Sequence, residues 1–253
     1  MSNNNKYFFG NLEVTKEKKI NNVKGVFNSV AEKYDIMNDV LSIGTHRIWK
    51  DILVNSILGL RSSTRSFSHL DLASGTGDIG YKILKKKNEN TSIYMMDINE
   101  NMLNQAMKRK EYANHKDNIQ FIVSDAEKIP LEDNSTDTVS IAFGIRNVAS
   151  IENALSEILR VLKHGGKFFC LEFSKVEIPM INNLYEFYSK NIIPEIGYII
   201  ANDRDSYQYL VESINRFPRQ EEFIEMISQA GFTRPKFINL SGGIAAIHSG
   251  WKI

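Results

Sequence analysis

A glycine-rich turn spans residues 71–78, with the sequence Asp-Leu-Ala-Ser-Gly-Thr-Gly-Asp. It directly follows a short apolar run, Phe67–Leu72, that is typical of a buried strand, and it precedes a stretch with helical periodicity. Gly75 and Gly77, on either side of Thr76, let the backbone turn tightly and approach a bound molecule closely. At the carboxyl edge of a parallel sheet, such a turn predicts a nucleotide-like cofactor site.

Two kinds of cofactor are compatible with this turn. Gly75–Gly80 matches the dinucleotide fingerprint literally, and Asp97 follows at about the spacing of a ribose-binding acid. A dinucleotide would bring an anionic pyrophosphate to a turn bracketed by Asp71 and Asp78. Two unit charges about 4 Å apart interact by about 4 kcal/mol at an effective dielectric constant of about 20. We therefore expect S-adenosylmethionine, which carries an ammonium and a sulfonium, instead of NAD.

Two further acids follow later apolar runs. Asp97 ends the run Ile93–Asp97, and its two oxygens can accept both hydroxyls of a ribose. Asp125 and Ala126 follow the next predicted strand and can flank an adenine, with the carboxylate accepting from the exocyclic amine. Any one of these acids could equally be a loop residue or a helix N-cap. Acids that end three successive strands favour a nucleoside pocket.

The elements that position these residues alternate between short apolar and longer amphipathic runs from Phe67 onward. This alternation is typical of βαβ units and predicts an α/β fold with a parallel sheet. Strands are predicted over 67–72, 92–97, 119–123, 137–143, 166–173, 235–240 and 244–251. A helix is predicted from Ser150, a good N-cap, to a stop at Gly165–Gly166.

The chain is predicted to form one domain with additions around its sheet. A helical cap is expected over 1–60, a cofactor-binding core over 67–175, a helical insertion over 176–216, and a helix with two strands over 217–253. The insertion follows the fifth predicted strand and is rich in Tyr and Ile.

Composition limits the class of protein. The 253 residues carry a formal net charge of +1, and no basic stripe is interleaved with aromatic residues, so we expect no nucleic-acid partner. Cys170 is the only cysteine and the five histidines show no ligand spacing, so we expect no metal site. No run of eighteen apolar residues and no targeting signal is found, so we expect a cytoplasmic protein. The lysine-rich segment 1–33 is either a solvated face or a contact for an anionic membrane surface.

Seven strings distributed over nearly the whole chain are more specific than the glycine turn. They are Val26–Asp35, Met37–Asp39, His46–Lys50, Phe143–Val148, Leu171–Ser174, Ser206–Ile214 and Ala245–Gly250. They resemble the C-methyltransferases of ubiquinone and menaquinone biosynthesis. The resemblance implies a class I methyltransferase fold, with a Rossmann-like, mostly parallel seven-stranded sheet and helices on both faces. It also implies methyl transfer to a ring carbon of a polyprenyl quinol, with Thr76, Asp97, Asp125 and Ala126 binding the cofactor.

The sequence departs from the family pattern at two positions. Ala142 stands where the family often has a serine that contacts the cofactor, which puts that one contact in doubt. His164 replaces the proline of the usual Leu-Lys-Pro-Gly-Gly turn, which changes little.

The ring carbon of a quinol becomes nucleophilic when the adjacent phenol loses its proton. Methylation of this carbon therefore requires a cation or a hydrogen-bond donor near the phenol oxygen to stabilise the phenolate. Arg146 and Asn147 follow the fourth predicted strand and so lie at the edge of the pocket. We expect Arg146 to stabilise the phenolate or to orient a water that takes the proton, and Asn147 to position the quinol. The alternative is that Arg146 only pairs with a structural carboxylate.

Several aromatic and basic side chains are secondary candidates. Tyr207, together with Tyr34 and Tyr209, is expected to close the pocket, although each is equally suited to a core position. His46 and His248 have a suitable pKa range for proton transfer, but lone histidines are more often structural.

The helical cap and the insertion fit a substrate with a long isoprenoid tail. Apolar residues of the insertion are expected either to line a channel for that tail or to form a homodimer surface; they include Tyr185, Phe187, Tyr188, Ile192, Ile193, Ile196, Tyr198, Ile199 and Ile200. Peripheral attachment to the inner face of a membrane would follow from the substrate. Two alternatives stay open: a methyltransferase for a soluble acceptor, and a noncatalytic partner of other quinone-biosynthesis enzymes.

Overall fold

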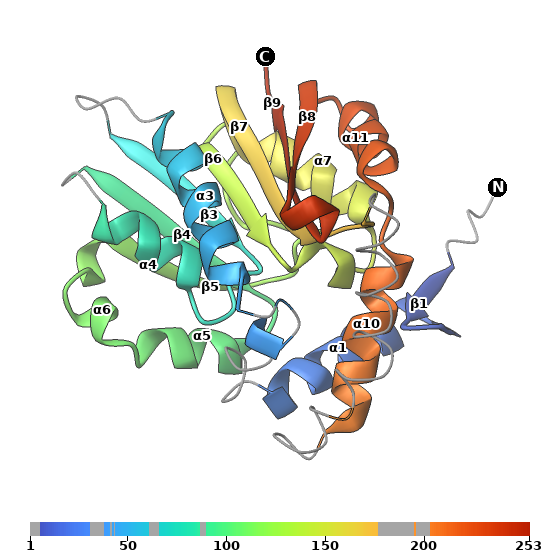
Figure 1. Cartoon of the computed structure of the whole chain (residues 1–253). Coiled ribbons are helices and arrows are strands. Elements are labelled where there is room, and N and C mark those ends of the chain that lie inside the picture. The colour runs from blue at the N-terminus through green and yellow to red at the C-terminus, as the bar shows by residue number, and fades with distance from the viewer. Residues whose placement is uncertain are drawn as a thin grey trace.

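A seven-stranded sheet forms the centre of the molecule (Figure 1). The computed structural model describes residues 6–30, 38–40, 42, 44–60, 66–86, 90–176, 195 and 203–253. The strand order is β5-β4-β3-β6-β7-β9-β8, and β9 is antiparallel to both of its neighbours while the pairs from β5 to β7 are parallel. The strands are β3 (Phe67–Leu72), β4 (Thr91–Asp97), β5 (Ile119–Val123), β6 (Thr136–Ala142), β7 (Leu162–Phe173), β8 (Thr233–Leu240) and β9 (Ala245–Trp251). The predicted α/β class and mostly parallel sheet are confirmed.

The largest difference from the predicted strands is at the start of β7. Helix α7 (Ile151–Val161) ends four residues before Gly165, and Leu162 already pairs with Thr136 of β6. Gly165 donates to the carbonyl of Lys252, and Lys252 donates to the carbonyl of Gly166, so the glycines extend the pairing of β7 with the end of β9 instead of ending a helix. The predicted N-cap is correct, because the Ser150 side chain accepts from the backbone N–H of Asn153.

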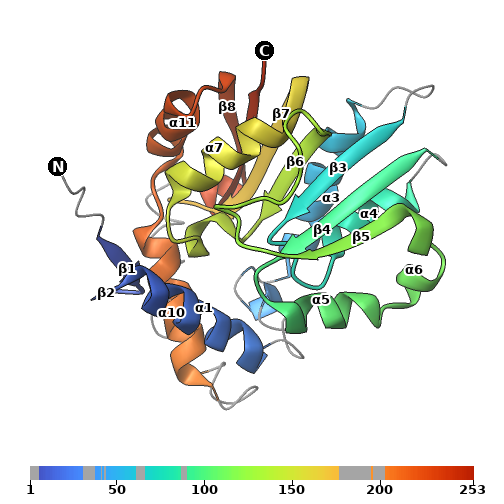
Figure 2. The same ribbon diagram turned by 180° about the vertical axis from the view of Figure 1, so that it is seen from behind.

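Helices cover both faces of the sheet, as Figures 1 and 2 show from opposite sides. Successive residues of β7 supply the two cores, because side chains alternate along a strand. Phe169 packs in a cluster with Trp49 and Leu53 of α3 (His46–Leu58). Phe168 packs in a second cluster with Leu155 of α7 and Phe223 of α11 (Gln220–Gln229). The remaining helices of the sheet layers are α4 (Asp78–Lys85), α5 (Glu100–Met107), α6 (Lys110–Ala113) and α11 (Gln220–Gln229), with short 3-10 turns η2 (Lys116–Asn118), η3 (Ile145–Asn147) and η5 (Ser241–Gly243).

The opening segment is not entirely helical. It begins with a hairpin of β1 (Tyr7–Phe9) and β2 (Leu12–Val14), which the periodicity did not predict, and continues into α1 (Lys16–Val30). Helix α10 (Arg204–Arg216) lies beside α1, and together they cover one end of the sheet in both views (Figures 1 and 2). This end is where the parallel strands have their carboxyl termini.

Some predicted elements lie outside the described residues. These are Tyr34, the apolar residues proposed for a tail channel or a dimer surface between 185 and 200, and most of the insertion, of which the structure describes residues 176, 195 and 203–216. Within the described ranges, none of the helices combines the length and the apolar character needed to cross a membrane.

Candidate active site

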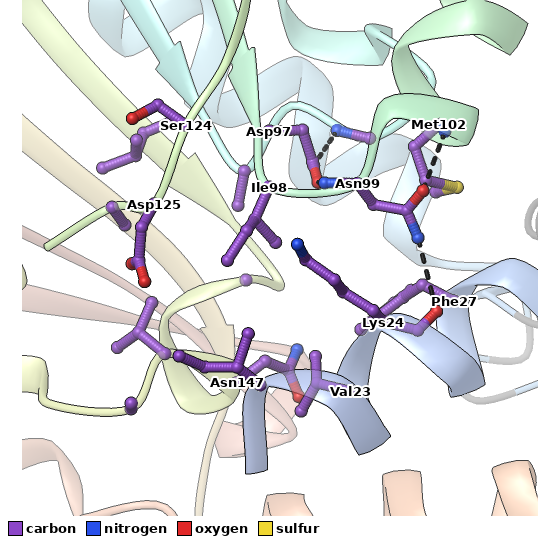
Figure 3. A pocket seen from close by; sticks show the side chains of 18 of the residues that line it. Val23, Lys24, Phe27, Asp97, Ile98, Asn99, Met102, Ser124, Asp125 and Asn147 are labelled. Carbon is purple, nitrogen blue, oxygen red and sulfur yellow. Dashed lines mark hydrogen bonds between the residues drawn. The ribbon is translucent and has the colours of Figure 1, made fainter. Parts of the chain in front are cut away.

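A cavity of about 750 Å³, partly open to solvent, lies between the carboxyl ends of the parallel strands and helix α1 (Figure 3). Gly75, Asp97 and Asp125 line it from the turns that follow β3, β4 and β5. Val23 and Phe27 cover it from α1. Its walls combine apolar surface with a few polar groups, as binding sites usually do.

The glycine turn contributes its backbone to this cavity. Gly75 has φ +54° and Gly77 has φ +81°, conformations that favour glycine. A Cβ on Gly77 would lie 2.9 Å from the ring of Tyr81, so this glycine serves helix packing. Gly75 lines the cavity, whereas the carbonyl of Thr76 accepts from Arg109 on the outer side. Of the four turn residues predicted to bind the cofactor, Asp71, Gly75, Thr76 and Gly77, the structure places only Gly75 in the cavity wall.

Asp97 joins the turn to the next strand. Its Oδ2 accepts from the N–H of Gly75 at 2.8 Å, and its Oδ1 accepts from the N–H of Asn99 at 2.8 Å. Burial raises the pKa of Asp97, and the N–H groups of Asn99 and Gly75 oppose that rise. Each oxygen keeps acceptor capacity, so the carboxylate can receive two hydroxyls side by side. Asp125 and Ala126 line the cavity as predicted.

The charge argument built on Asp71 and Asp78 is wrong. Although burial alone would raise the pKa of Asp78, ion pairs with Lys50 and Arg109 lower it, and these pairs face a different part of the surface. Asp71 is 1% exposed beneath the turn, accepts from the N–H of Gly80 at 3.0 Å, and does not line the cavity. Burial raises the pKa of Asp71 to about 7. Neither carboxylate therefore presents a free charge to a ligand.

Hydrogen bonds between asparagine side chains, which we call the asparagine clip, hold α1 over the cavity; the residues are Asn28, Asn99 and Asn101. Asn28 of α1 accepts from the Nδ2 atoms of Asn99, at 2.9 Å, and of Asn101, at 3.0 Å. The Nδ2 of Asn99 also donates to the carbonyl of Lys24 in α1, at 3.4 Å (Figure 3). Asn99 also caps α5, because its Oδ1 accepts from the N–H groups of Asn101 and Met102. Asn99 thus fixes both α5, which follows Asp97, and α1, which covers the cavity.

Lys24 was not among the predicted site residues. Its side chain extends from α1 into the cavity toward Ile98 (Figure 3), and its charge lowers the pKa of Asp97. The available signal is its position on the helix face that carries Val23 and Phe27, whose apolar spacing by itself predicts only a packing face.

Asn147 and Arg146 point to opposite sides of η3. Asn147 lines the cavity; its Oδ1 accepts from the hydroxyl of Tyr209 at 2.9 Å, while its buried Nδ2 has no acceptor among the described residues. Arg146 does not line the cavity. Its buried guanidinium donates to Glu172 at 2.6 Å and to the carbonyl of Phe143 at 2.7 Å. The structure therefore matches the alternative in which Arg146 pairs with a structural carboxylate.

The wall next to η3 requires a glycine. A Cβ on Gly144 would lie 2.6 Å from the Cβ of Ala73 in the glycine turn. Phe143 precedes it with φ +58°, a left-handed conformation that is costly for an aromatic residue, and its ring packs 4.9 Å from that of Phe173. Ala142 does not line the cavity. The turns after β3 and β6 thus touch each other across the floor of the site.

The other predicted candidates are buried away from the cavity lining. Tyr207 is 0% exposed, and its hydroxyl has no partner in the described part of the chain. Burial and then the charge of Lys50 lower the pKa of His46 to about 4, and burial lowers that of His248 to about 4. Neither histidine lines the cavity, so both stay neutral and structural at pH 7. Across the described ranges, no group of three His, Cys, Asp or Glu residues is arranged to hold a metal ion.

Comparison with known proteins identifies the family. The model of the ubiE/COQ5 methyltransferase family matches residues 12–252. The chain belongs to this family. A UbiE named a ubiquinone/menaquinone biosynthesis C-methyltransferase, from Rickettsia prowazekii, is 50% identical and covers 99% of both chains. A rice protein named 2-methoxy-6-polyprenyl-1,4-benzoquinol methylase, mitochondrial, is 47% identical over 97% of this chain and 88% of the relative.

Solved structures agree with the fold of this UbiE/COQ5 methyltransferase. A SAM-dependent methyltransferase from Aquifex aeolicus superposes with a TM-score of 0.57 at 20% identity, over 79% of this chain and 89% of that one. A putative S-adenosylmethionine-dependent methyltransferase from Methanococcus maripaludis gives 0.55 at 21% identity, over 100% and 97%. The predicted class I methyltransferase fold is confirmed.

S-adenosylmethionine is therefore the cofactor of this UbiE/COQ5 methyltransferase, and the dehydrogenase alternative is excluded. The cavity fits it: the paired acceptors of Asp97 suit the ribose, and Asp125 with Ala126 suits the adenine. The prediction of S-adenosylmethionine was correct, although the charges at Asp71 and Asp78 did not justify it.

Proposed function

We propose that this UbiE/COQ5 methyltransferase methylates a ring carbon of a polyprenylated benzoquinol, or of demethylmenaquinol, in ubiquinone or menaquinone biosynthesis. The names of the relatives support this acceptor class. The observation that carries the proposal is the amide of Asn147, whose Nδ2 is buried in the cavity wall with no acceptor in the described part of the chain. A buried donor of this kind is costly unless a ligand atom completes it.

Asn147 is the residue that we propose contacts the acceptor. The hydroxyl of Tyr209 holds its Oδ1 and thereby turns Nδ2 toward the ligand. An N–H donor that is already fixed near the phenol oxygen of the quinol stabilises the negative charge on that oxygen. It lowers the activation barrier of methyl transfer because the donor does not have to reorient during the reaction. Arg146 acts through this group: its ion pair with Glu172 and its bond to the carbonyl of Phe143 keep η3 in place. Arg146 is thus a positioning residue.

The remaining lining residues hold the cofactor and exclude water. Asp97, Asp125, Ala126 and Gly75 are proposed to bind S-adenosylmethionine, which when bound supplies an electrophilic methyl group on its sulfonium. Val23 and Phe27 on α1 cover the site with apolar surface. Exclusion of water strengthens the Asn147 contact, because hydrogen bonds to charge are stronger at low dielectric constant.

The substrate suggests the setting of the reaction. We place the protein in the cytoplasm, in peripheral contact with the inner face of a membrane, since a polyprenyl quinol partitions into lipid. A homodimer and contacts with other quinone-biosynthesis enzymes remain part of the same proposal.

The direct test is methyl transfer from S-adenosylmethionine labelled on its methyl group to a demethylated polyprenyl benzoquinol or naphthoquinol in detergent or vesicles. We expect label in the lipid extract, and label that appears about 100-fold more slowly with Asn147→Ala. Label found only with soluble phenols would favour the alternative of a soluble acceptor. Cofactor binding without transfer to any acceptor would favour a noncatalytic partner.

A further inference from the structure

A second cavity of about 560 Å³, partly open to solvent, lies on the far side of η3 from the cofactor cavity. It is bounded by β1, α1, η3 and α10, which lie together at one corner of the molecule in both views (Figures 1 and 2). Four cationic residues line it: Lys6, Lys19, Arg146 and Arg216. No aspartate or glutamate is among its described lining residues, although the whole chain carries a net charge of only +1.

Two of these four cations form an ion pair with a carboxylate of the described residues, and two do not. Lys6 pairs with Glu13 at 3.1 Å, and Arg146 pairs with Glu172 at 2.6 Å. Within the described residues, neither Lys19 nor Arg216 has a carboxylate at ion-pair distance. Burial lowers the pKa of Lys19; the charge of Glu127 opposes this shift, the charge of Arg216 adds to it, and Glu152 opposes it more weakly. Two like charges therefore face one cavity, and no carboxylate of the described residues lies within ion-pair distance of either.

Both uncompensated cations are held in place with donors to spare. The Lys19 Nζ donates to the carbonyl of Val148 at 2.6 Å, which leaves two of its three N–H donors. The Arg216 guanidinium stacks on the ring of Phe8, 3.3 Å from the centroid, so the N–H groups at its edge stay available. The hairpin that carries Phe8 is itself anchored, because the adjacent Phe9 stacks on Tyr209 with centroids 4.2 Å apart.

We propose that this cavity is an anion site that takes a phosphate group, from free phosphate or pyrophosphate or from a phospholipid headgroup. Phosphate oxygens accept charge-assisted hydrogen bonds from several directions, which matches an ammonium on α1 and a guanidinium on α10 facing the same space. Arginine and lysine are the residues proteins use most for such groups. The site does not depend on the proposed quinol acceptor, since it can be tested without methyl transfer.

The test is calorimetric titration of the purified full chain with inorganic pyrophosphate, at constant ionic strength set with sodium chloride. We expect one site per chain. Arg216→Gln combined with Lys19→Gln should weaken binding at least about ten-fold, because each removes charge-assisted donors. Arg216→Lys should retain part of the affinity. The matched control is Arg204→Gln, which removes an exposed cation from the same helix outside the cavity and should change affinity less than two-fold.

Vesicle sedimentation identifies the source of the phosphate. If the site takes a headgroup, phosphatidylglycerol vesicles should bind the wild type more than the double variant, phosphatidylcholine vesicles should not show this difference, and pyrophosphate should compete. If it takes a soluble ligand, pyrophosphate binding alone should depend on the two cations. Thermal unfolding should show that the variants are folded. Absence of pyrophosphate binding to the wild type, or equal binding by the double variant, would overturn the proposal.

Discussion

Replacing Asp97 by asparagine tests whether S-adenosylmethionine affinity depends on the hydrogen-bond acceptors of this one side chain or on the summed charge of the glycine turn. Each Asp97 oxygen accepts one backbone N–H, from Gly75 and from Asn99, and each has capacity for one ribose hydroxyl. Asparagine keeps one acceptor oxygen and puts an N–H group opposite one of these two backbone donors. One charge-assisted hydrogen bond to the ribose is lost, at about 1.5–3 kcal/mol. The dissociation constant for S-adenosylmethionine should therefore rise about 10- to 150-fold.

Asp78→Asn is the matched control, because it makes the same change in the same turn. Asp78 pairs with Lys50, whose side chain is 5% exposed, and with Arg109. Its replacement leaves a buried cation unpaired and should lower the free energy of unfolding by about 3 kcal/mol. Cofactor affinity should change less than about three-fold, since these partners face another surface. Calorimetric titration with S-adenosylmethionine and denaturant unfolding measure the two effects. Equal loss of affinity in both variants would show that the summed charge of the turn controls binding, and would refute the argument.

Four further substitutions test residues in, or in contact with, the turns around the cavity. Asn147→Ala should lower kcat for methyl transfer about 100-fold while cofactor affinity stays within about three-fold, and Tyr209→Phe should lower kcat about ten-fold by releasing the Asn147 amide. Gly144→Ala should weaken S-adenosylmethionine binding about ten-fold or more in the same titration, because the new Cβ would meet that of Ala73 at 2.6 Å. Asp71 has a folded pKa of about 7, above its value of about 4 in the unfolded chain, so the folded state binds more protons and stability should fall as pH rises from about 4 to about 7. Asp71→Asn should remove up to about 4 kcal/mol of this dependence in denaturant unfolding at each pH.

Each of these has an outcome that contradicts it. Unchanged turnover of Asn147→Ala would remove its proposed contact with the acceptor. Wild-type cofactor affinity in Gly144→Ala would mean that the floor of the site adapts to a methyl group. Parallel stability profiles of Asp71→Asn and wild type between pH 4 and 7 would mean that the Asp71 pKa is not raised on folding.

The sheet and part of the site follow from local sequence patterns. Strand β3 is a run of residues buried on both faces, and its end had to lie at the edge where parallel βα units bind ligands. The same rule placed Asp97 and Asp125 correctly, because a residue that ends a parallel strand has little freedom of position. The hairpin β1–β2 was missed because its strands have three residues each, too few for a period to emerge.

The errors concern groups whose partners are distant in sequence. Asp78 is neutralised by Lys50 and Arg109, which reach it only through tertiary packing of α3 and the segment before α6. Arg146 was expected in the pocket, yet Glu172 at the end of β7 holds it on the other side of η3. Charge patterns along a sequence therefore show which charges exist, but their pairing is decided by the fold.

The clip between Asn28 and Asn99 has a consequence for the order of biosynthesis. The segment that closes the cofactor cavity is synthesised before all the residues that hold it. Asn28 is held by Asn99, which is synthesised later. The N–H of Asn11 donates to the carboxylate of Glu212 at 3.1 Å, and Glu212 is synthesised later still. The N-terminal segment thus lacks one or both of these contacts until Glu212 has been synthesised. The contacts that fix the N-terminal segment over the cofactor cavity can therefore form only after α5 and α10 have been synthesised.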